Sequence, residues 1–173
     1  DDYDLAYGIR SVRLRYFNVA GADSRCRVGE WHNPETHLIP NILKSTFGDG
    51  KEFELFGDDY DTRDGTCIRD YVNVEDLADA HILALEYLVN GGRTDFFNLG
   101  TNEGSSVKEV FAECEKVTGK KIPLKIKGRR PGDPAVLVAD NRKAKEILHW
   151  NPRRTLSDSI RTAYMWEKKM RGN

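Results

Sequence analysis

The chain alternates between two spacings of apolar residues, one typical of strands and the other of helices. In residues 9–17 apolar side chains alternate with arginines, which predicts a strand. Helical spacing follows from Thr36 to Phe47, with Pro40 tolerated in the first turn. Further extended segments are expected at 52–56, 67–72, 96–99 and 122–126. Helices and short strands therefore interleave, which predicts a mixed α/β fold.

Glycine and asparagine mark the ends of two further helices. Gly8 is placed to cap the C-terminal end of a helix in residues 1–8. Asn73 is placed to cap the N-terminal end of a longer helix. The apolar face of that longer helix is expected to comprise Val74, Leu77, Ala78, His81, Ile82, Leu85 and Leu88.

Hydroxyl and acidic residues predict the starts of the remaining helices. Ser106 and Glu109 have the spacing of a capping box, and Gly119 stops the helix that follows. Asp140 and Thr155 are the expected caps of the last two helices. The polar, glycine-bearing segment 18–35 is predicted to be a loop, and a loop of that length is more often functional than idle.

Composition narrows the class of protein. The 173 residues include 27 Lys and Arg against 28 Asp and Glu, giving a net charge of −1. Near-neutral charge argues against a polyanion-binding protein, and no apolar run approaches the roughly 20 residues of a transmembrane helix. We therefore expect neither nucleic acid nor membrane as a partner.

Cysteine and histidine spacings give no sign of a metal site. The cysteines, Cys26, Cys67 and Cys114, form no Cys-x-x-Cys pair, and no Cys/His spacing suits zinc. We interpret them as reduced thiols in a cytoplasmic protein.

Several catalytic and cofactor motifs are missing from the sequence. It contains no glycine-rich dinucleotide fingerprint, no P-loop and no Ser/His/Asp set at an informative spacing. It starts at Asp1 without methionine, and we expect that an upstream segment has been removed. The sequence thus indicates binding more clearly than catalysis.

Anion binding is favoured by two separate segments. Residues 120–130 hold six basic side chains and no acid; the lysines are expected on a solvated strand face, whereas Arg130 begins a constrained turn. Asp133 in that turn could accept hydrogen bonds from vicinal hydroxyls. Arg69 lies in an apolar strand and needs Asp70, another acid or a ligand anion as its partner. The two arginines could bind one diphosphate.

Six segments carry, in order, the motifs of one enzyme family. They are residues 14–22, 36–40, 65–72, 74–81, 97–100 and 129–134. Together they resemble the C-terminal part of the UDP-glucose 4-epimerases, which are extended short-chain dehydrogenases/reductases. The resemblance implies hydride removal from C4 of a UDP-sugar to NAD, rotation of the 4-keto sugar and hydride return to its other face.

The resemblance also implies a division of the chain. Residues 1–22 would be the last strand region of a truncated NAD-binding Rossmann domain, and 23–173 a UDP-sugar-binding domain, with some segments returning to the Rossmann sheet. NAD would be bound mainly by the missing N-terminal half, which would also hold the catalytic residues. The chain alone is therefore expected to be inactive, and its full-length parent to be a cytoplasmic homodimer.

Site residues follow from the same resemblance, position by position. Phe17 corresponds to a contact with the nicotinamide end of NAD, and Asn18 to a contact with the phosphate region of the substrate. The UDP-contacting positions are His37 and Leu38, and the segment along uracil is Glu54, Leu55 and Phe56.

The remaining positions concern the diphosphate and the sugars. Arg69 and Arg130 correspond to the diphosphate-binding arginines, and Asp133 to the acid on ribose. Leu137 falls at the gate beside the sugar, where the family has Tyr, Cys or Ser, so acceptance of UDP-GlcNAc stays open.

Two alternatives remain at the level of sequence. One is a related nucleotide-sugar epimerase acting on UDP-GlcNAc or UDP-xylose. The other is a non-catalytic binding fragment that presents the basic strand at 120–130 to an acidic partner or nucleic acid, which predicts steep salt dependence.

Overall fold

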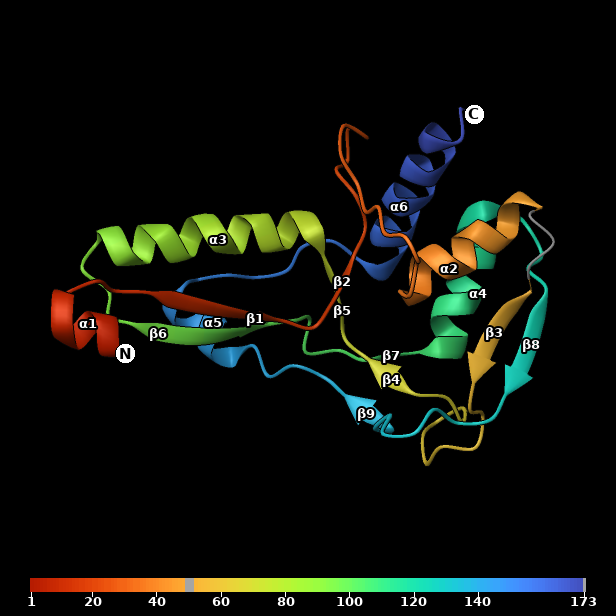
Figure 1. Cartoon of the computed structure of the whole chain (residues 1–173), viewed down its shortest axis with the longest axis horizontal. Helices are drawn as coiled ribbons and strands as arrows, with labels where there is room; N and C mark the ends of the chain where they lie inside the picture. Colours follow the sequence, from red (N-terminus) through yellow and green to blue (C-terminus); the bar gives the residue numbers. More distant parts are fainter. Residues whose placement is uncertain (49–51, 173) are drawn as a thin grey trace.

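The computed structural model describes residues 1–48 and 52–172, and its elements gather toward two ends (Figure 1). At one end, β1 (Val12–Tyr16) pairs in parallel with β6 (Asp95–Leu99). The helices α1 (Asp2–Tyr7), α3 (Val74–Val89) and α5 (Arg142–Ile147) lie at that end. The other end holds α2 (Leu38–Lys44), η1 (Ser45–Phe47), α4 (Val107–Thr118) and α6 (Leu156–Met170). The mixed α/β prediction is confirmed.

Short strands connect the two ends and border the second one. β2 (Asn18–Ala20) pairs in parallel with β5 (Tyr71–Asn73). β4 (Ile68–Arg69) lies between antiparallel β7 (Ser105–Ser106) and parallel β9 (Val136–Leu137). β3 (Phe53–Phe56) pairs in parallel with β8 (Leu124–Lys127). The chain thus passes between the ends through β2, β4 and β5.

Buried apolar side chains of the described residues form a cluster at each end. The cluster beneath α2, α4 and α6 comprises Ala20, Ile39, Ile42, Leu43, Phe53, Leu55, Tyr71, Val110, Cys114, Ile122 and Ile160. The cluster between α3, α5 and the β1–β6 pair comprises Val72, Leu77, Ala80, Ala84, Phe97, Leu99, Ala144, Leu148 and Trp150. Segments far downstream of residue 22 therefore pack with β1.

Two extended segments differ from the prediction. The expected loop at 18–35 contains β2, because three residues suffice to pair with β5 and carry too little periodicity to be recognised. The expected strand at 67–72 is divided at Asp70 into β4 and β5. The buried Asp70 carboxylate accepts hydrogen bonds from the backbone N–H groups of Thr101, Asn102 and Ala139.

The predicted apolar face of α3 is largely wrong. Leu77 is buried as expected, but Ile82 and Leu85 are 58% and 63% exposed, while Ala80 and Ala84 are buried. The small alanine side chains allow the helix backbone to approach the strands closely. Side-chain size, as well as apolarity, therefore determines which face of α3 packs against them.

The strand predicted at 122–126 is present as β8, Leu124–Lys127, but its apolar side chains are not buried. Ile122 is buried, but Leu124 and Ile126 in β8 are exposed. In the described part of the chain β8 pairs with β3 alone, so it is an edge strand whose outer side chains are uncovered.

The predicted helix ends agree with the structure at five of the six positions. Gly8 and Gly119 cap α1 and α4 in the left-handed conformation, the Asn73 side chain accepts from the Glu75 N–H, and capping boxes begin α4 and α6. In α5 the N-cap is Asn141 rather than Asp140, although the Asp140 carboxylate still accepts a hydrogen bond from the Arg142 N–H. Among residues 1–48 and 52–172, none of the helices combines the length and apolarity that crossing a bilayer demands.

Candidate functional site

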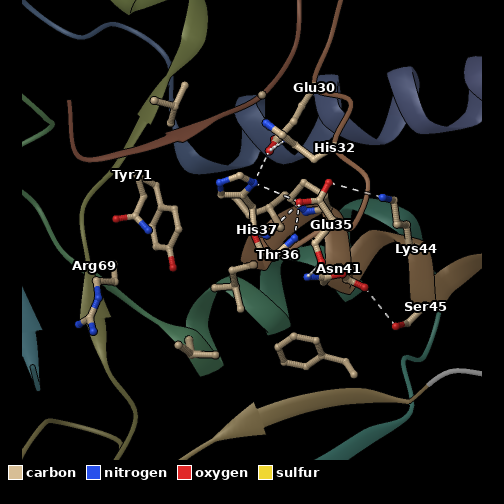
Figure 2. A pocket seen from close by; sticks show the side chains of 18 of the residues that line it. Glu30, His32, Glu35, Thr36, His37, Asn41, Lys44, Ser45, Arg69 and Tyr71 are labelled. Carbon is tan, nitrogen blue, oxygen red and sulfur yellow. Dashed lines mark hydrogen bonds and ion pairs between the residues drawn. The ribbon is translucent and has the colours of Figure 1, made fainter. Parts of the chain in front are cut away.

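A cavity of about 1780 Å³ lies where the connecting strands meet the helical end (Figure 2). Its walls come from the start of β2, the loop that leads to α2, the strands β3 and β4, and the turn after β8. Both polar and apolar side chains line it. Segments far apart in the sequence therefore share one concave surface large enough for a nucleotide-sized ligand.

The residues predicted from the family resemblance lie on this cavity, with one exception. Those that line it are Phe17, Asn18, His37, Leu38, Glu54, Leu55, Phe56, Arg69, Arg130 and Asp133. Leu137 is the exception. It is paired with Arg69 between β9 and β4, one strand away from the lining, and is about half exposed.

Arg69 is held firmly against the cavity wall. Its Nη1 donates to the carbonyl oxygens of Ile68 at 2.9 Å and Pro134 at 2.8 Å. Its Nη2 lies 3.3 Å from Oδ1 of Asp133, and the side chain is only 12% exposed. The acid that pairs with Arg69 is therefore Asp133 and not Asp70, whose carboxylate faces backbone donors instead.

The neighbouring arginines of the turn have different surroundings. Arg129 pairs with Asp59, Nε to Oδ1 at 2.7 Å, and covers the Tyr60 ring. Arg130 has no carboxylate partner among the described residues, and its guanidinium carbon lies 3.9 Å from the centre of the Phe56 ring. Arg130 thus offers unpaired charge to the cavity, whereas the charge of Arg129 is neutralised.

The strand β3 forms a second wall. Leu55 is fully buried beneath the cavity, and Glu54 forms an ion pair with Lys127 of β8, Oε1 to Nζ 3.2 Å. Phe56, at the end of the strand, supports Arg130 through the ring contact. A flat apolar surface therefore adjoins a cation, an arrangement suited to a planar base attached to a phosphate.

A polar cluster in the loop before α2 groups the predicted His37 with three lining residues that the prediction missed, Glu30, His32 and Glu35. Nδ1 of His37 lies 2.7 Å from Oε1 of Glu30 and 3.1 Å from Oε1 of Glu35, and Nδ1 of His32 lies 3.1 Å from the same Glu30 oxygen (Figure 2). Cys/His spacing could not reveal this group, because half of it is glutamate and its members are brought together by the loop.

Glu35 is ionised more readily than a free glutamate. Its partial burial alone would raise the pKa of the carboxyl, but hydrogen bonds from the backbone N–H groups of His37 and Thr36, together with the charge of Lys44, lower that pKa below its ordinary value. The carboxylate form is therefore stabilised at the start of α2.

Tyr71 is a further lining residue that the prediction missed. It is buried in β5, and that burial is the main cause that raises the pKa of its hydroxyl. Its neutral phenol faces the cavity beside Arg69 (Figure 2). In the sequence, the motif Arg69-Asp70-Tyr71 indicates anion binding through its arginine and gives no sign that Tyr71 lines a cavity.

The sequence matches the model of a known family over residues 1–163, and that family is described as GDP-mannose 4,6 dehydratase. The chain belongs to this family. A curated UDP-glucose 4-epimerase from Lactobacillus helveticus is 56% identical over 167 residues, which are 95% of this chain and 50% of that protein. The resemblance to UDP-glucose 4-epimerases is confirmed.

Solved structures give the same result for the fold. The crystal structure of a UDP-glucose 4-epimerase, 49% identical, superposes with a TM-score of 0.95 over 99% of this chain and 52% of its own. The structure of the UDP-glucose 4-epimerase from Bifidobacterium longum in complex with NAD+ and UDP is 38% identical. It superposes with a TM-score of 0.90 over 98% of this chain and 50% of its own. The fold is that of the C-terminal part of these epimerases. The chain spans about half the length of the curated relatives it matches.

Proposed function

We propose that the chain is the UDP-sugar-binding portion of an NAD-dependent UDP-glucose 4-epimerase. The supporting observation is that Arg69, Arg130 and Asp133 border one cavity. The Arg69 side chain is only 12% exposed, and Arg130 has no carboxylate partner among the described residues. Two guanidinium groups from separate segments can bind the two phosphates of a diphosphate through forked hydrogen bonds.

Each wall of the cavity has a role in this proposal. The uracil lies along Glu54, Leu55 and Phe56, and Asp133 accepts hydrogen bonds from the ribose hydroxyls. The other proposed substrate contacts are Asn18, His37 and Leu38. Asp133 then has two tasks, because its carboxylate also pairs with Arg69.

The epimerisation itself is placed mostly outside this chain. NAD supplies hydride acceptance and return at C4 of the sugar, which interconverts UDP-glucose and UDP-galactose. Phe17 is the proposed contact of this chain with the cofactor, and the 173 residues hold no glycine-rich fingerprint for dinucleotide phosphates. We therefore expect no turnover by this chain alone and assign no catalytic residue to it. The complete enzyme is proposed to be a cytoplasmic homodimer.

Sugar preference is proposed to depend on Leu137. It lies one strand away from the cavity lining, next to Arg69, where a larger side chain could reach toward the sugar. In the complete enzyme, L137Y should reduce turnover of UDP-GlcNAc relative to UDP-glucose. An unchanged ratio of kcat/KM values for the two sugars would remove Leu137 from this role.

The binding proposal is tested by calorimetric titration of the protein with UDP. We expect saturable binding that R130A weakens roughly 10- to 100-fold, since a hydrogen bond to a charged group contributes about 1.5–3 kcal/mol. R142A is the matched control, because Arg142 pairs with Asp140 on the exposed surface of α5. Arg69 also holds backbone carbonyls, so R69K is preferred to R69A for that position.

Two results would contradict the proposal. One is the absence of UDP binding by protein whose circular dichroism shows it to be folded; the other is an equal affinity of R130A and the unsubstituted protein. Preference for duplex DNA over UDP, with steep salt dependence, would favour the alternative of a basic binding surface.

A further inference from the structure

We propose that Glu30, His32, Glu35 and His37 form a binding site for one divalent transition-metal ion, with Zn²⁺ as the best match. Each residue offers one donor atom, and the four atoms lie within 4.8 Å of one another. The residues occupy eight consecutive positions of a single loop that leads into α2. Nothing in the proposed UDP-sugar binding requires a metal there.

The distances between donor atoms are close to those of a tetrahedral site. Zn²⁺ binds imidazole nitrogen and carboxylate oxygen at about 2.0–2.2 Å, so tetrahedral donors lie roughly 3.4 Å apart. The observed separations include 2.7 Å from His37 Nδ1 to Glu30 Oε1, and 3.1 Å from His32 Nδ1 to the same oxygen. Small side-chain rotations would complete the geometry around a central ion.

The chemistry of the donors favours zinc over magnesium or calcium. Two imidazoles and two carboxylates combine nitrogen with oxygen, whereas Mg²⁺ and Ca²⁺ prefer oxygen throughout. The rings of His32 and His37 lie 4.8 Å apart, centre to centre, and both turn Nδ1 toward Glu30. A cation between them would replace the hydrogens that now bridge nitrogen to carboxylate.

Hydrogen bonds hold the Glu35 carboxylate and the backbone of Glu30 in place. Oε1 of Glu35 accepts the N–H groups of Thr36 and His37 at 2.9 Å each, and its side chain is 7% exposed. The carbonyl oxygen of Glu30 accepts a hydrogen bond from Nε1 of Trp166 at 2.9 Å, which ties the loop to α6. Hydrogen bonds of the kind that the Glu35 carboxylate accepts orient metal ligands and tune their affinity.

One positive charge competes with the metal. Nζ of Lys44 lies 3.4 Å from Oε2 of Glu35, on the side of the carboxylate away from the imidazoles (Figure 2). Because Oε1 is the oxygen that faces His37, the metal and Lys44 can use different oxygens of the same group. With both carboxylates ionised, a divalent ion leaves the cluster neutral apart from Lys44.

The experiment titrates the protein with Zn²⁺ in the absence of nucleotide, by isothermal calorimetry. We expect one Zn²⁺ per chain, and H32A and H37A should each weaken binding by about tenfold or more. H81A is the matched control, since His81 lies on α3 and contacts Tyr16 and the Leu77 carbonyl. The side chains of His32 and His37 are about half exposed, so their removal should leave the fold intact, which circular dichroism verifies.

A second measurement identifies the ligands. Co²⁺ in place of Zn²⁺ should give the visible absorption of a four-coordinate nitrogen and oxygen site, with no thiolate charge-transfer band, and C26S should bind as well as the unsubstituted protein. Failure to bind Zn²⁺ stoichiometrically, equal affinity of H32A and H37A with the unsubstituted chain, or loss of binding in C26S would each overturn the proposal. UDP affinity is measured separately. His37 is also a proposed UDP contact and His32 is not, so loss of Zn²⁺ binding in H32A with unchanged UDP affinity distinguishes the metal proposal from the UDP proposal.

Discussion

Asp70 and Asp76 are buried carboxylates that hold the fold together away from solvent. Asp70 accepts three backbone N–H groups where the chain passes between the two ends, and this explains why it does not pair with Arg69. Asp76, in the first turn of α3, accepts from the N–H groups of Arg153 and Arg154. Acidic residues beside a binding motif are therefore not all binding residues.

Removal of the Asp76 carboxylate should destabilise the protein. Asp76 is 1% exposed and receives Nη1 of Arg154 at 2.5 Å, so D76A leaves two backbone N–H groups without their acceptor and removes the buried carboxylate from beside Arg154, whose Nε still pairs with Glu75. We expect the free energy of unfolding to fall by about 3 kcal/mol, as measured by urea denaturation.

Asp79 provides the matched control for that measurement. It lies 3.8 Å from the same Arg154 nitrogen but is 55% exposed. Water replaces its contribution, so D79A should change the free energy of unfolding by no more than about 0.5 kcal/mol. Equal losses in D76A and D79A would show that burial does not set the strength of the Asp76 interaction.

Among the helices, α6 begins with a capping box whose acid has a strongly shifted pKa. Hydrogen bonds from the Thr155 side chain, the contact with Arg161 and the Thr155 N–H lower the pKa of Asp158 from 3.8 to about 2. A lowered pKa in the folded state stabilises the protein above pH 4, and that stability is lost as the pH falls from about 4 to 2.

D158N should therefore flatten the acid side of the stability profile. The asparagine cannot ionise, so the variant is less stable than the unsubstituted protein at pH 7 and approaches it as the pH falls toward 2. Thermal unfolding across this range, followed by circular dichroism, gives the comparison. Parallel profiles for the two proteins would show that Asp158 does not contribute to acid sensitivity.

The accuracy of the sequence predictions varies with the range of the interaction. The boxes at Ser106 and Thr155 involve residues three positions apart, so local sequence suffices to place α4 and α6. The strands β2, β7 and β9 have two or three residues each and exist through pairing with distant segments. No local pattern of that length distinguishes a strand from a loop.

The candidate site shows the same limit. Arg69 and Arg130 stand out in the sequence because charge in an apolar strand or a rigid turn requires a partner. The folded turn determines that the partner of Arg69 is Asp133. It also determines that Arg129 pairs with Asp59. The grouping of Glu30 with His37 depends on loop geometry, which spacing rules for regular elements do not describe.

At the scale of the whole molecule, apolar side chains remain exposed at one end. They include Ile82 and Leu85, three positions apart on one face of α3, and Leu5 of α1 at 88% exposure. Exposed apolar side chains grouped on one helix face favour association. We expect this chain to self-associate at high concentration, and I82E/L85E to shift it toward monomer in analytical ultracentrifugation. A concentration-independent monomer in the unsubstituted chain would contradict this expectation.

The pairing of β1 with β6 has a consequence for the rate of folding. Ser11, at the start of that pair, donates its N–H to Thr94, 83 residues further along the chain, and Ala22 donates to Thr162 across 140 residues. Each contact requires a long loop to close, at an entropic cost that no local turn offsets. High contact order slows folding. The helices α4 and α6, whose caps are local, should form early, and the closure of β1 onto β6 should limit the refolding rate.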